Sequence, residues 1–519
     1  MKSAKTMVTV CLLAAVVAST AITGCSSSGT SQGQNQEGQE QNRGGQEQNQ
    51  GSQEQNQEGQ DQSQGSQENP ATADTNGAEE SRNPAASPSR EENKSPGKAG
   101  TCAAGKTMEA KEPEKADISP EDYEGWNRLL KAQTLSGEFQ KGLEQFAWKS
   151  GSQVLKDAPG NGNFSPLSLY YTLALAGCGA EGETAAQILG SLGVEDRKEL
   201  ADQCRRLYQW YVYQTQRDQE QMAHYGMEGN KSTIRLGNSL WISDQLPVYE
   251  DYQNLAAEQF FASSYGVDFG DPSTGKQMGD WIAEKTKGVL APKLEPDPAT
   301  ALAILNTLYF YGGWAEPFAE GDTREDAFTL EDGSQVQVPY MNQTQLDGSF
   351  KKRDGCTLSW LETGNNCRMI FLLPDEGKTV EEFLDSPEKL EVAMEAGQEG
   401  WSQGTVVWKV PKFSFGSSYR LEDALAAMGM DRMFGEQAEL GGISPEHLYV
   451  SSVIQETHIG VDEQGVEGAA YTMLAMECGA VLEQKETAEM ILDRPFLFGI
   501  RDNAHDVWLF LGVCRNPES

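Results

Sequence analysis

The sequence contains little of what an enzyme active site requires. It has four histidines in 519 residues, and it carries neither a Gly-x-Ser-x-Gly elbow nor an HExxH motif. No nucleophile can be paired with a general base, which argues against a hydrolase. The nine cysteines include no CxxC pair and follow no regular spacing, so we expect no metal site, no cofactor and no disulfide framework.

Basic residues are also scarce. Lysine and arginine together number 41 against 78 aspartates and glutamates, and the formal net charge is −37. Binding to nucleic acid depends on clustered basic side chains that neutralise phosphates. We therefore expect no nucleic-acid partner, and acidity of this kind mainly keeps an exported protein soluble.

The amino terminus lacks a full membrane span but has the pattern of an export signal. In residues 1–24, Lys2 and Lys5 precede an apolar run at residues 7–18, which is too short for a stable transmembrane helix. The tetrapeptide Ile-Thr-Gly-Cys, ending at Cys25, resembles a bacterial lipoprotein box in which the cysteine is lipidated and becomes the new amino terminus. A plain signal peptide followed by a chance cysteine is the alternative interpretation.

A spacer with almost no apolar residues follows. Residues 25–117 consist mainly of Gln, Gly, Asn, Glu and Ser in near-repeats. Such a segment has no core to offset the entropy lost on ordering, so we expect a disordered linker. It would hold a domain away from a lipid anchor at the outer face of the bacterial membrane. Residues 118–519 are long enough for one large α+β domain.

The most informative stretch is residues 461–480. It opens with an acidic turn and continues through small and apolar residues with almost no charge. Successive side chains of a strand face opposite ways, and here one parity is small or apolar while the other carries two carboxylates. The pattern fits a strand with one buried face, and it fits an ordinary edge strand or surface loop equally well. The small or apolar parity consists of Val466, Gly468, Ala470, Thr472, Leu474 and Met476.

The rest of the chain alternates between helical and strand patterns. Residues 139–155 have apolar side chains at helical spacing, and Ser165 can cap a helix that begins at Pro166. Residues 301–310 are apolar on both faces, as expected of a central strand. Further expected elements are a strand at 234–243, helices at 249–261 and 421–428, and a hairpin at 356–373 that turns near Gly364.

Taken in order, these blocks resemble the serpin family of protease inhibitors. The sequence Glu-Gln-Gly-Val-Glu-Gly-Ala-Ala-Tyr-Thr, at 463–472, is similar to the hinge of the serpin reactive loop. Gly-Gly-Trp-Ala-Glu-Pro-Phe, at 312–318, resembles the family's most distinctive internal motif, and Asp-Arg-Pro-Phe-Leu-Phe-Gly, at 493–499, matches its carboxy-terminal signature. The resemblance covers about residues 135–517. It implies the α+β serpin fold, with a large, mostly antiparallel central sheet, two further sheets, eight or nine helices and an exposed reactive loop.

The resemblance also assigns a cluster that the family calls the shutter. Ser165, Ser168 and Asn306 map to it. Where most inhibitory serpins have a shutter histidine, this chain has Gln455. An amide can donate and accept hydrogen bonds as neutral imidazole does, so a bridge from Gln455 to Asn306 is open to it. A pH-dependent role of the histidine is not expected.

The same resemblance locates the breach, where the reactive loop first enters the sheet. Trp314 maps to the breach tryptophan, and Glu463 at the base of the hinge is expected to pair with Lys412. The alternative for Glu463 is a solvated carboxylate in a turn. The assigned hinge residues are Glu463, Gly465, Val466, Glu467, Gly468, Ala469 and Ala470.

The mechanism implied by the resemblance is suicide inhibition. A serine protease attacks the loop and forms an acyl-enzyme, and the cleaved loop then enters the main sheet as an extra strand. Counting along the loop places the reactive bond at Gly479–Ala480, or at Cys478–Gly479 if the loop is one residue shorter. Small residues at the bond resemble an elastase- or subtilisin-like preference, with cysteine proteases as the other target class. We expect the inhibitor to be a monomer.

Two other functions are compatible with parts of the sequence. A non-inhibitory serpin-fold binding protein would be favoured by a charge or a proline on the inward hinge face, and neither is present. Cys478 could act as a reactive thiol, but no activating partner is visible in the sequence.

Overall fold

The computed structural model describes residues 8–18, 97–226, 232–394, 400–466 and 486–518, with the backbone alone described for residues 8–18. All of them belong to one compact unit formed by Met1–Ile22 and Ser95–Ser519. The predicted reactive bond, the predicted lipidation site Cys25 and most of the predicted spacer lie outside the described residues.

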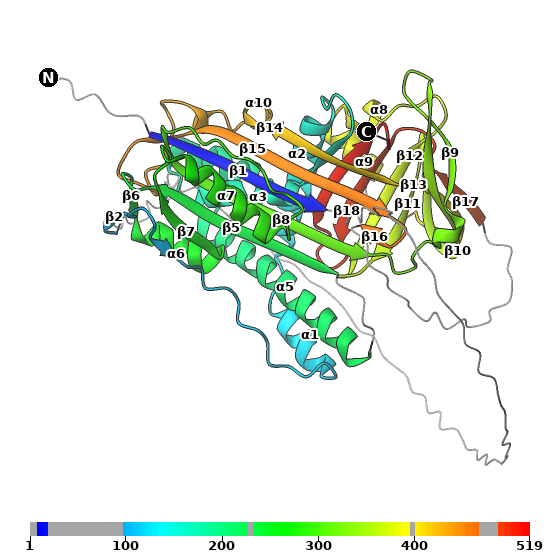
Figure 1. The fold of residues 1–519 in the computed structure, drawn as a ribbon, viewed down its shortest axis with the longest axis horizontal. Coiled ribbons are helices and arrows are strands. Elements are labelled where there is room, and N and C mark those ends of the chain that lie inside the picture. The colour runs from blue at the N-terminus through cyan, green and yellow to red at the C-terminus, as the bar shows by residue number, and fades with distance from the viewer. Residues whose placement is uncertain (1–7, 19–96, 227–231, 395–399, 467–485, 519) are drawn as a thin grey trace, which may run out of the picture. The chain divides into compact units, whose positions relative to one another are not determined.

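An eight-stranded sheet lies at the centre of this unit (Figure 1). Its strands follow the order β1-β15-β16-β8-β5-β7-β3, and β14 pairs with β15. The bounds are β1 Val8–Ala18, β15 Leu448–Asp462, β16 Gly465–Val466, β8 Thr300–Gly313, β5 Thr233–Ser243, β7 Ala262–Val267, β3 Thr107–Met108 and β14 Phe413–Arg420.

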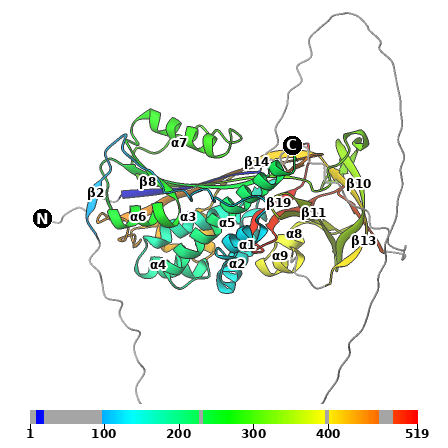
Figure 2. The ribbon, with the colours of Figure 1, turned by 90° about the horizontal axis from the view of Figure 1, so that it is seen from below.

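Strand β8 is the buried centre of the sheet, as the sequence predicts. Every residue of β8 is buried, because helices cover both faces. Figure 2 shows α7 (Pro272–Lys285) alone on one face, while α3 (Pro166–Cys178) and α5 (Arg197–His224) lie on the other. A strand covered on both sides requires apolar residues at consecutive positions, which is the pattern of residues 301–310.

Strand β1 comes from the apolar run that the sequence assigns to the export signal. It pairs in the parallel direction with both β15 and β8, and Figure 1 shows it in blue between these two strands. Strands β8 and β15 are therefore bridged over most of their length by residues from the start of the chain.

A second sheet of nine strands follows the order β17-β13-β10-β11-β12-β18-β19-β4, with β9 paired to β10, and a third sheet contains β2 and β6. The predicted α+β fold with one large sheet and two further sheets is confirmed. The bounds are β17 Glu486–Ile491, β13 Ser402–Pro411, β10 Gln335–Arg353, β11 Cys356–Thr363, β12 Cys367–Pro374, β18 Phe496–Asp502, β19 Trp508–Cys514, β4 Gly162–Phe164, β9 Arg324–Thr329, β2 Ala99–Thr101 and β6 Pro247–Tyr249.

The described residues contain ten α-helices, in keeping with the expectation of about eight or nine. Ser165 caps α3 as predicted: its Oγ accepts a hydrogen bond from the Ser168 amide at 3.2 Å, and Pro166 occupies the first turn. None of these helices is long and apolar enough to cross a membrane. The remaining α-helices are α1 Tyr123–Lys131, α2 Gly137–Leu155, α4 Gly182–Ser191, α6 Glu250–Gln259, α8 Glu381–Leu384, α9 Pro387–Met394 and α10 Glu422–Ala427, and the 3-10 helices are η1 Glu320–Asp322 and η2 Arg432–Phe434.

Residues 97–131 add a segment along one side of the sheet. Its strands β2 and β3 pair with β6 and β7, and helix α1 packs on α5 with Trp126 fully buried. Residues 97–117 fall within the stretch that the sequence assigns to the spacer. Their short strands and few apolar residues gave no periodicity from which to recognise them.

Candidate functional site

The last described residues before the predicted loop form β16, which lies between β15 and β8 in the central sheet. Val466 pairs with Val461 of β15 on one side and with Gly312 of β8 on the other, both in the antiparallel direction. We call the strand position between β8 and β15 the β8–β15 gap. Strand β16 occupies one end of this gap, and β1 occupies the rest.

The turn before β16 is built on Asp462. Its Oδ1 accepts hydrogen bonds from the amides of Gln464 at 2.9 Å and Gly465 at 3.3 Å, an arrangement typical of Asx turns. Gly465 has a φ of +155°, and a Cβ there would lie 2.4 Å from the Gly312 carbonyl oxygen. Only glycine fits this close approach, which explains why the acidic turn of the sequence contains one.

Trp314 holds this turn against the end of β8. Its side chain is buried, and its Nε1 donates a hydrogen bond to the Asp462 carbonyl at 2.9 Å. Its backbone amide donates to the Gln464 carbonyl at 3.0 Å. The predicted breach tryptophan therefore contacts the turn between β15 and β16, just before the predicted loop.

Glu463 lies beside Lys412, as expected from the sequence. Its Oε2 accepts a hydrogen bond from Lys412 Nζ at 2.7 Å, and its Oε1 accepts one from Thr323 Oγ1 at 2.7 Å. The residue is only 8% exposed. Burial alone would raise its pKa, but the bonds from Lys412 and Thr323 outweigh burial and hold the pKa of Glu463 below its usual value. The solvated alternative does not describe this carboxylate.

The predicted shutter residues meet under the middle of the β8–β15 gap, in two groups. In the first, Ser168 Oγ donates to Asn306 Oδ1, and Asn306 Nδ2 donates to Asn238 Oδ1 at 2.7 Å. In the second, Gln455 Oε1 accepts from the Ser165 amide at 2.9 Å, and its Nε2 donates to the Ser165 carbonyl at 3.0 Å. All five residues are buried. The start of α3 thus bonds separately to β8 and to β15.

The bridge from Gln455 to Asn306 that the sequence leaves open is not formed. Ala14 of β1 pairs with Asn306 on one side and with Gln455 on the other. The backbones of the two residues are therefore two strand spacings, about 10 Å, apart, and the Asn306 amide bonds to Ser168 and Asn238. Gln455 satisfies its amide on the backbone of Ser165 instead.

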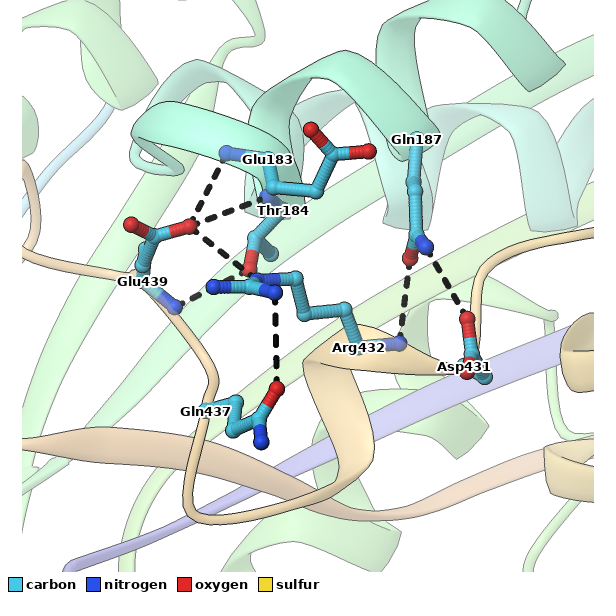
Figure 3. Close-up of polar contacts among 7 residues, drawn as sticks. All are labelled: Glu183, Thr184, Gln187, Asp431, Arg432, Gln437 and Glu439. Atoms are coloured by element: carbon cyan, nitrogen blue, oxygen red, sulfur yellow. Dashed lines mark hydrogen bonds and ion pairs between the residues drawn. The ribbon is translucent and has the colours of Figure 1, made fainter.

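A further polar cluster anchors the segment that leads into the opposite end of β15 (Figure 3). Glu439 Oε2 accepts hydrogen bonds from the backbone amides of Glu183 at 2.9 Å and Thr184 at 3.4 Å, and from Arg432 Nε at 3.2 Å. Thr184 Oγ1 accepts in return from the Glu439 amide at 3.0 Å. The carboxylate satisfies amides at the N-terminus of α4, where the helix dipole favours negative charge. These bonds and Arg432 outweigh desolvation and lower the pKa of Glu439.

The cysteines of the described region play no part in this site. Cys102, Cys178, Cys204, Cys356, Cys367 and Cys514 are free and buried. Burial raises the pKa of the Cys356 thiol to about 11, so this thiol is protonated and unreactive at neutral pH. Within the described ranges no cluster of three or more potential metal ligands is present. Cys478, Gly479 and Ala480, together with the hinge residues Glu467, Gly468, Ala469 and Ala470, lie outside the described residues.

Three contributors to the site were missed by the sequence analysis. Asn238 bonds to Asn306, Thr323 bonds to Glu463, and Glu439 caps α4. An amide side chain in the middle of an expected strand, as at Asn238, was a visible signal of a buried hydrogen bond. Thr323 and Glu439 lie in irregular segments far along the chain from their partners, and the sequence pattern gives no signal for them.

Comparisons with known proteins agree with this arrangement. The family model described as "Serpin (serine protease inhibitor)" matches residues 141–517. An uncharacterized serpin-like protein of Thermococcus kodakarensis is 30% identical over 376 residues, covering 70% of this chain and 83% of that protein. Serpin-Z1A of Triticum aestivum is 31% identical over 386 residues, covering 70% of this chain and 91% of the relative.

Solved structures show the same fold. Native tengpin, a thermophilic serpin, superposes with a TM-score of 0.62 at 23% identity, over 74% of this chain and 95% of tengpin. AtSerpin1 of Arabidopsis in its native stressed conformation also gives a TM-score of 0.62, at 24% identity, over 74% of this chain and 100% of that structure. About three quarters of this chain therefore contains the complete fold. Because the family model spans well over half of its length, the chain belongs to the serpin family, whose members are mostly protease inhibitors rather than enzymes.

Proposed function

We propose that this serpin is a suicide-substrate inhibitor of serine proteases with elastase- or subtilisin-like specificity, acting as a monomer. The observation that carries the proposal is the double pairing of β16, which bonds to both β15 and β8 at one end of the β8–β15 gap. A strand that continues from Val466 in the same direction would enter this gap antiparallel to both neighbours. Each added residue would extend two ladders of hydrogen bonds.

The sequence beyond Val466 suits such a strand. Val466 itself is fully buried, and the next residues of its parity, Gly468, Ala470 and Thr472, carry no charge. Burying a neutral polar group without a hydrogen-bond partner costs roughly 2–7 kcal/mol. Burying an unpaired charge costs more than that. An inward face of small uncharged residues therefore lets insertion proceed quickly enough to compete with hydrolysis of the acyl-enzyme.

The target class follows from the residues at the reactive bond. Counting along the loop places this bond at Gly479–Ala480, with Cys478–Gly479 as the second choice. Small side chains fit proteases with a shallow primary pocket and do not fit proteases that require a basic residue. A cysteine protease with the same preference is the other target class.

We also propose that the protein is exported and anchored by a lipid on Cys25 at the outer face of a bacterial membrane. The leader pattern of residues 1–24 and the polar stretch of residues 25–96 support this placement. Replacing Cys25 by alanine is expected to abolish labelling with a radioactive fatty acid in expressing cells. Labelling that persists in the variant would contradict the assignment.

The inhibitory function is tested by mixing the chain that begins at Ser26 with pancreatic elastase and with subtilisin. The expected result is a covalent complex that survives denaturing electrophoresis, with the new amino terminus at Ala480 or Gly479. The control is Val466→Asp, which places a charge at a fully buried position and should yield cleaved protein without complex. A matched variant, Val466→Ala, should still form complex.

Cleavage at the same bond without complex in the unsubstituted chain would contradict inhibition of these proteases. That outcome would favour the alternative function, a non-inhibitory binding protein with the serpin fold. The comparison of Val466→Asp with Val466→Ala then shows whether charge at the hinge affects the loop at all.

A further inference from the structure

The β8–β15 gap already holds a strand, and that strand comes from the predicted leader. Residues 8–18 pair in parallel with β15 from Val8 opposite Leu448 to Val17 opposite His458. They pair at the same time with β8, up to Ala18 opposite Phe310. Both ladders that an inserted reactive loop would use are therefore occupied in the full-length chain.

The ends of β1 and β16 approach each other inside the gap. Ala18 pairs with Phe310 and Val466 pairs with Gly312, two positions further along β8. Strand β1 runs parallel to β8 whereas β16 runs antiparallel to it, so the two segments point toward one another. Residues beyond Val466 cannot pair more deeply with β8 and β15 while β1 is in place.

The composition of residues 8–18 suits the position. The segment reads Val-Thr-Val-Cys-Leu-Leu-Ala-Ala-Val-Val-Ala, without charge, glycine or proline, and strands buried on both faces are typically such runs. Its Ala14 lies level with the shutter residues Asn306 and Gln455. A small residue therefore stands where the neighbouring strands carry their largest buried amides.

We propose that residues 8–18 form an intramolecular plug that keeps the unprocessed chain from inserting its reactive loop. Removal of residues 1–24 at Cys25 would empty the gap and activate the inhibitor. This inference rests on the proposed inhibitory function, which it extends by a control step. A chain that still carries the leader would then be cut by a protease without trapping it, and only the processed chain would inhibit.

The plug is tested by its effect on complex formation in the full-length chain, kept soluble in mild detergent. Leu12 lies opposite Ile304 of β8 and Val453 of β15, both fully buried, so Leu12→Asp should expel the strand. We expect full-length protein to form little complex with elastase or subtilisin, and Leu12→Asp to form at least about tenfold more. The matched control Ser27→Asp, outside β1, should behave as the unsubstituted chain. Equal, readily measured amounts of complex from all three proteins would overturn the proposal.

Occupancy of the gap is tested separately by cross-linking. Cys11 pairs with Ser452 of β15, and paired residues on neighbouring strands have the Cα separation that a disulfide requires. Ser452→Cys should give a disulfide to Cys11 under mild oxidation, detected by peptide mass. Thr457→Cys, level with Val16, should not, because it lies about 16 Å further along the strand.

The two tests separate the possible failures. Absence of the cross-link in Ser452→Cys would refute the plug whatever the inhibition assays show. The opposite result is a cross-link in Ser452→Cys together with no complex from either Leu12→Asp or the chain beginning at Ser26. It would show that β1 lies in the gap and would refute the inhibitory function instead.

Discussion

The contacts of Glu463 fix the turn between β15 and β16, at the base of the predicted hinge. The carboxylate is nearly buried, yet it is charged because Lys412 and Thr323 donate to it. Removing one partner of a buried ion pair leaves an uncompensated charge, which costs more than the pair contributes when intact. The hinge therefore depends on Lys412 more strongly than a surface ion pair would suggest.

Lys412→Met is expected to destabilise the protein. The lysine side chain is 36% exposed while that of Glu463 is 10% exposed, so water can replace the lysine only in part. The loss should fall between the ~1 kcal/mol of an exposed pair and the ~3–5 kcal/mol of a fully buried one. The free energy of unfolding in urea measures it.

Lys409→Met is the matched control for that substitution. Lys409 Nζ bonds to Asp326 at 2.6 Å, but the Asp326 side chain is 58% exposed. Because water solvates the exposed Asp326 carboxylate, loss of this pair should cost less than loss of the Lys412 pair. Equal losses in the two methionine variants would show that Glu463 is not held by Lys412.

The pKa of Glu463 gives its contribution a definite pH dependence. Because the pKa is lower in the folded state than the usual value of about 4.3, the stabilisation is complete above that value and is lost as pH falls through the folded pKa. The stability difference between the unsubstituted chain and Glu463→Gln should therefore shrink below about pH 4. Urea unfolding at several pH values measures this difference.

The neighbouring carboxylate of Asp462 should have the opposite pH dependence, which Asp462→Asn tests. Burial raises the pKa of Asp462 despite the hydrogen bonds it accepts, so its ionisation works against folding as pH rises through its titration range. The unsubstituted chain should lose stability relative to Asp462→Asn on going from acid to neutral pH. If the stability differences for Asp462→Asn and Glu463→Gln changed with pH in the same direction, the opposite pKa shifts assigned to these two carboxylates would be contradicted.

Among the elements, the start of α4 positions the segment that enters β15. Gly182 begins the helix with a φ of +53°, and a Cβ there would lie 2.5 Å from a Glu439 carboxylate oxygen. The glycine thus allows Glu439 to reach the amides of Glu183 and Thr184. Figure 3 shows this carboxylate between the helix and Arg432.

Gly182→Ala is expected to lower the free energy of unfolding by about 1–2 kcal/mol or more. The left-handed backbone alone costs that much for a residue with a Cβ, and displacement of Glu439 adds to it. Gly190→Ala in the same helix is the control, since nothing lies within 4 Å of its Cβ position. That variant should be stabilised by roughly 0.5–1 kcal/mol. If both variants lowered the free energy of unfolding, the cause would be a general effect of substitution in α4 and not the contact between Gly182 and Glu439.

The elements that the sequence predicted correctly are those specified by local patterns. Strand β8 is apolar on both faces, α3 begins with a capping serine and a proline, and the turn of the β11–β12 hairpin contains Asn365 and Asn366 with positive φ. Local patterns do not reveal contacts between segments that are distant in the sequence. Thr323 bonds to Glu463 across 140 positions of sequence, and no sequence pattern signals that residues 8–18 pair with β8 and β15.

For the whole molecule, the decisive feature is a central sheet with a gap one strand wide. Strands β8 and β15 are joined by β16 at one end and by β1 over the rest. Without residues 1–24 the gap has no occupant from the amino terminus, and the residues that follow Val466 in the sequence have a composition suited to it. A sheet that can gain a strand is held by a kinetic barrier rather than by its free energy alone.

The most direct test of loop insertion is the thermal unfolding midpoint of the chain beginning at Ser26, measured before and after the loop is cut once by subtilisin. Insertion adds a strand to the central sheet and buries Gly468, Ala470 and Thr472, so the midpoint should rise strongly after cleavage. The same cut in Val466→Asp should raise it much less. A midpoint that stays the same or falls after cleavage of the unsubstituted chain would contradict insertion of the loop between β8 and β15.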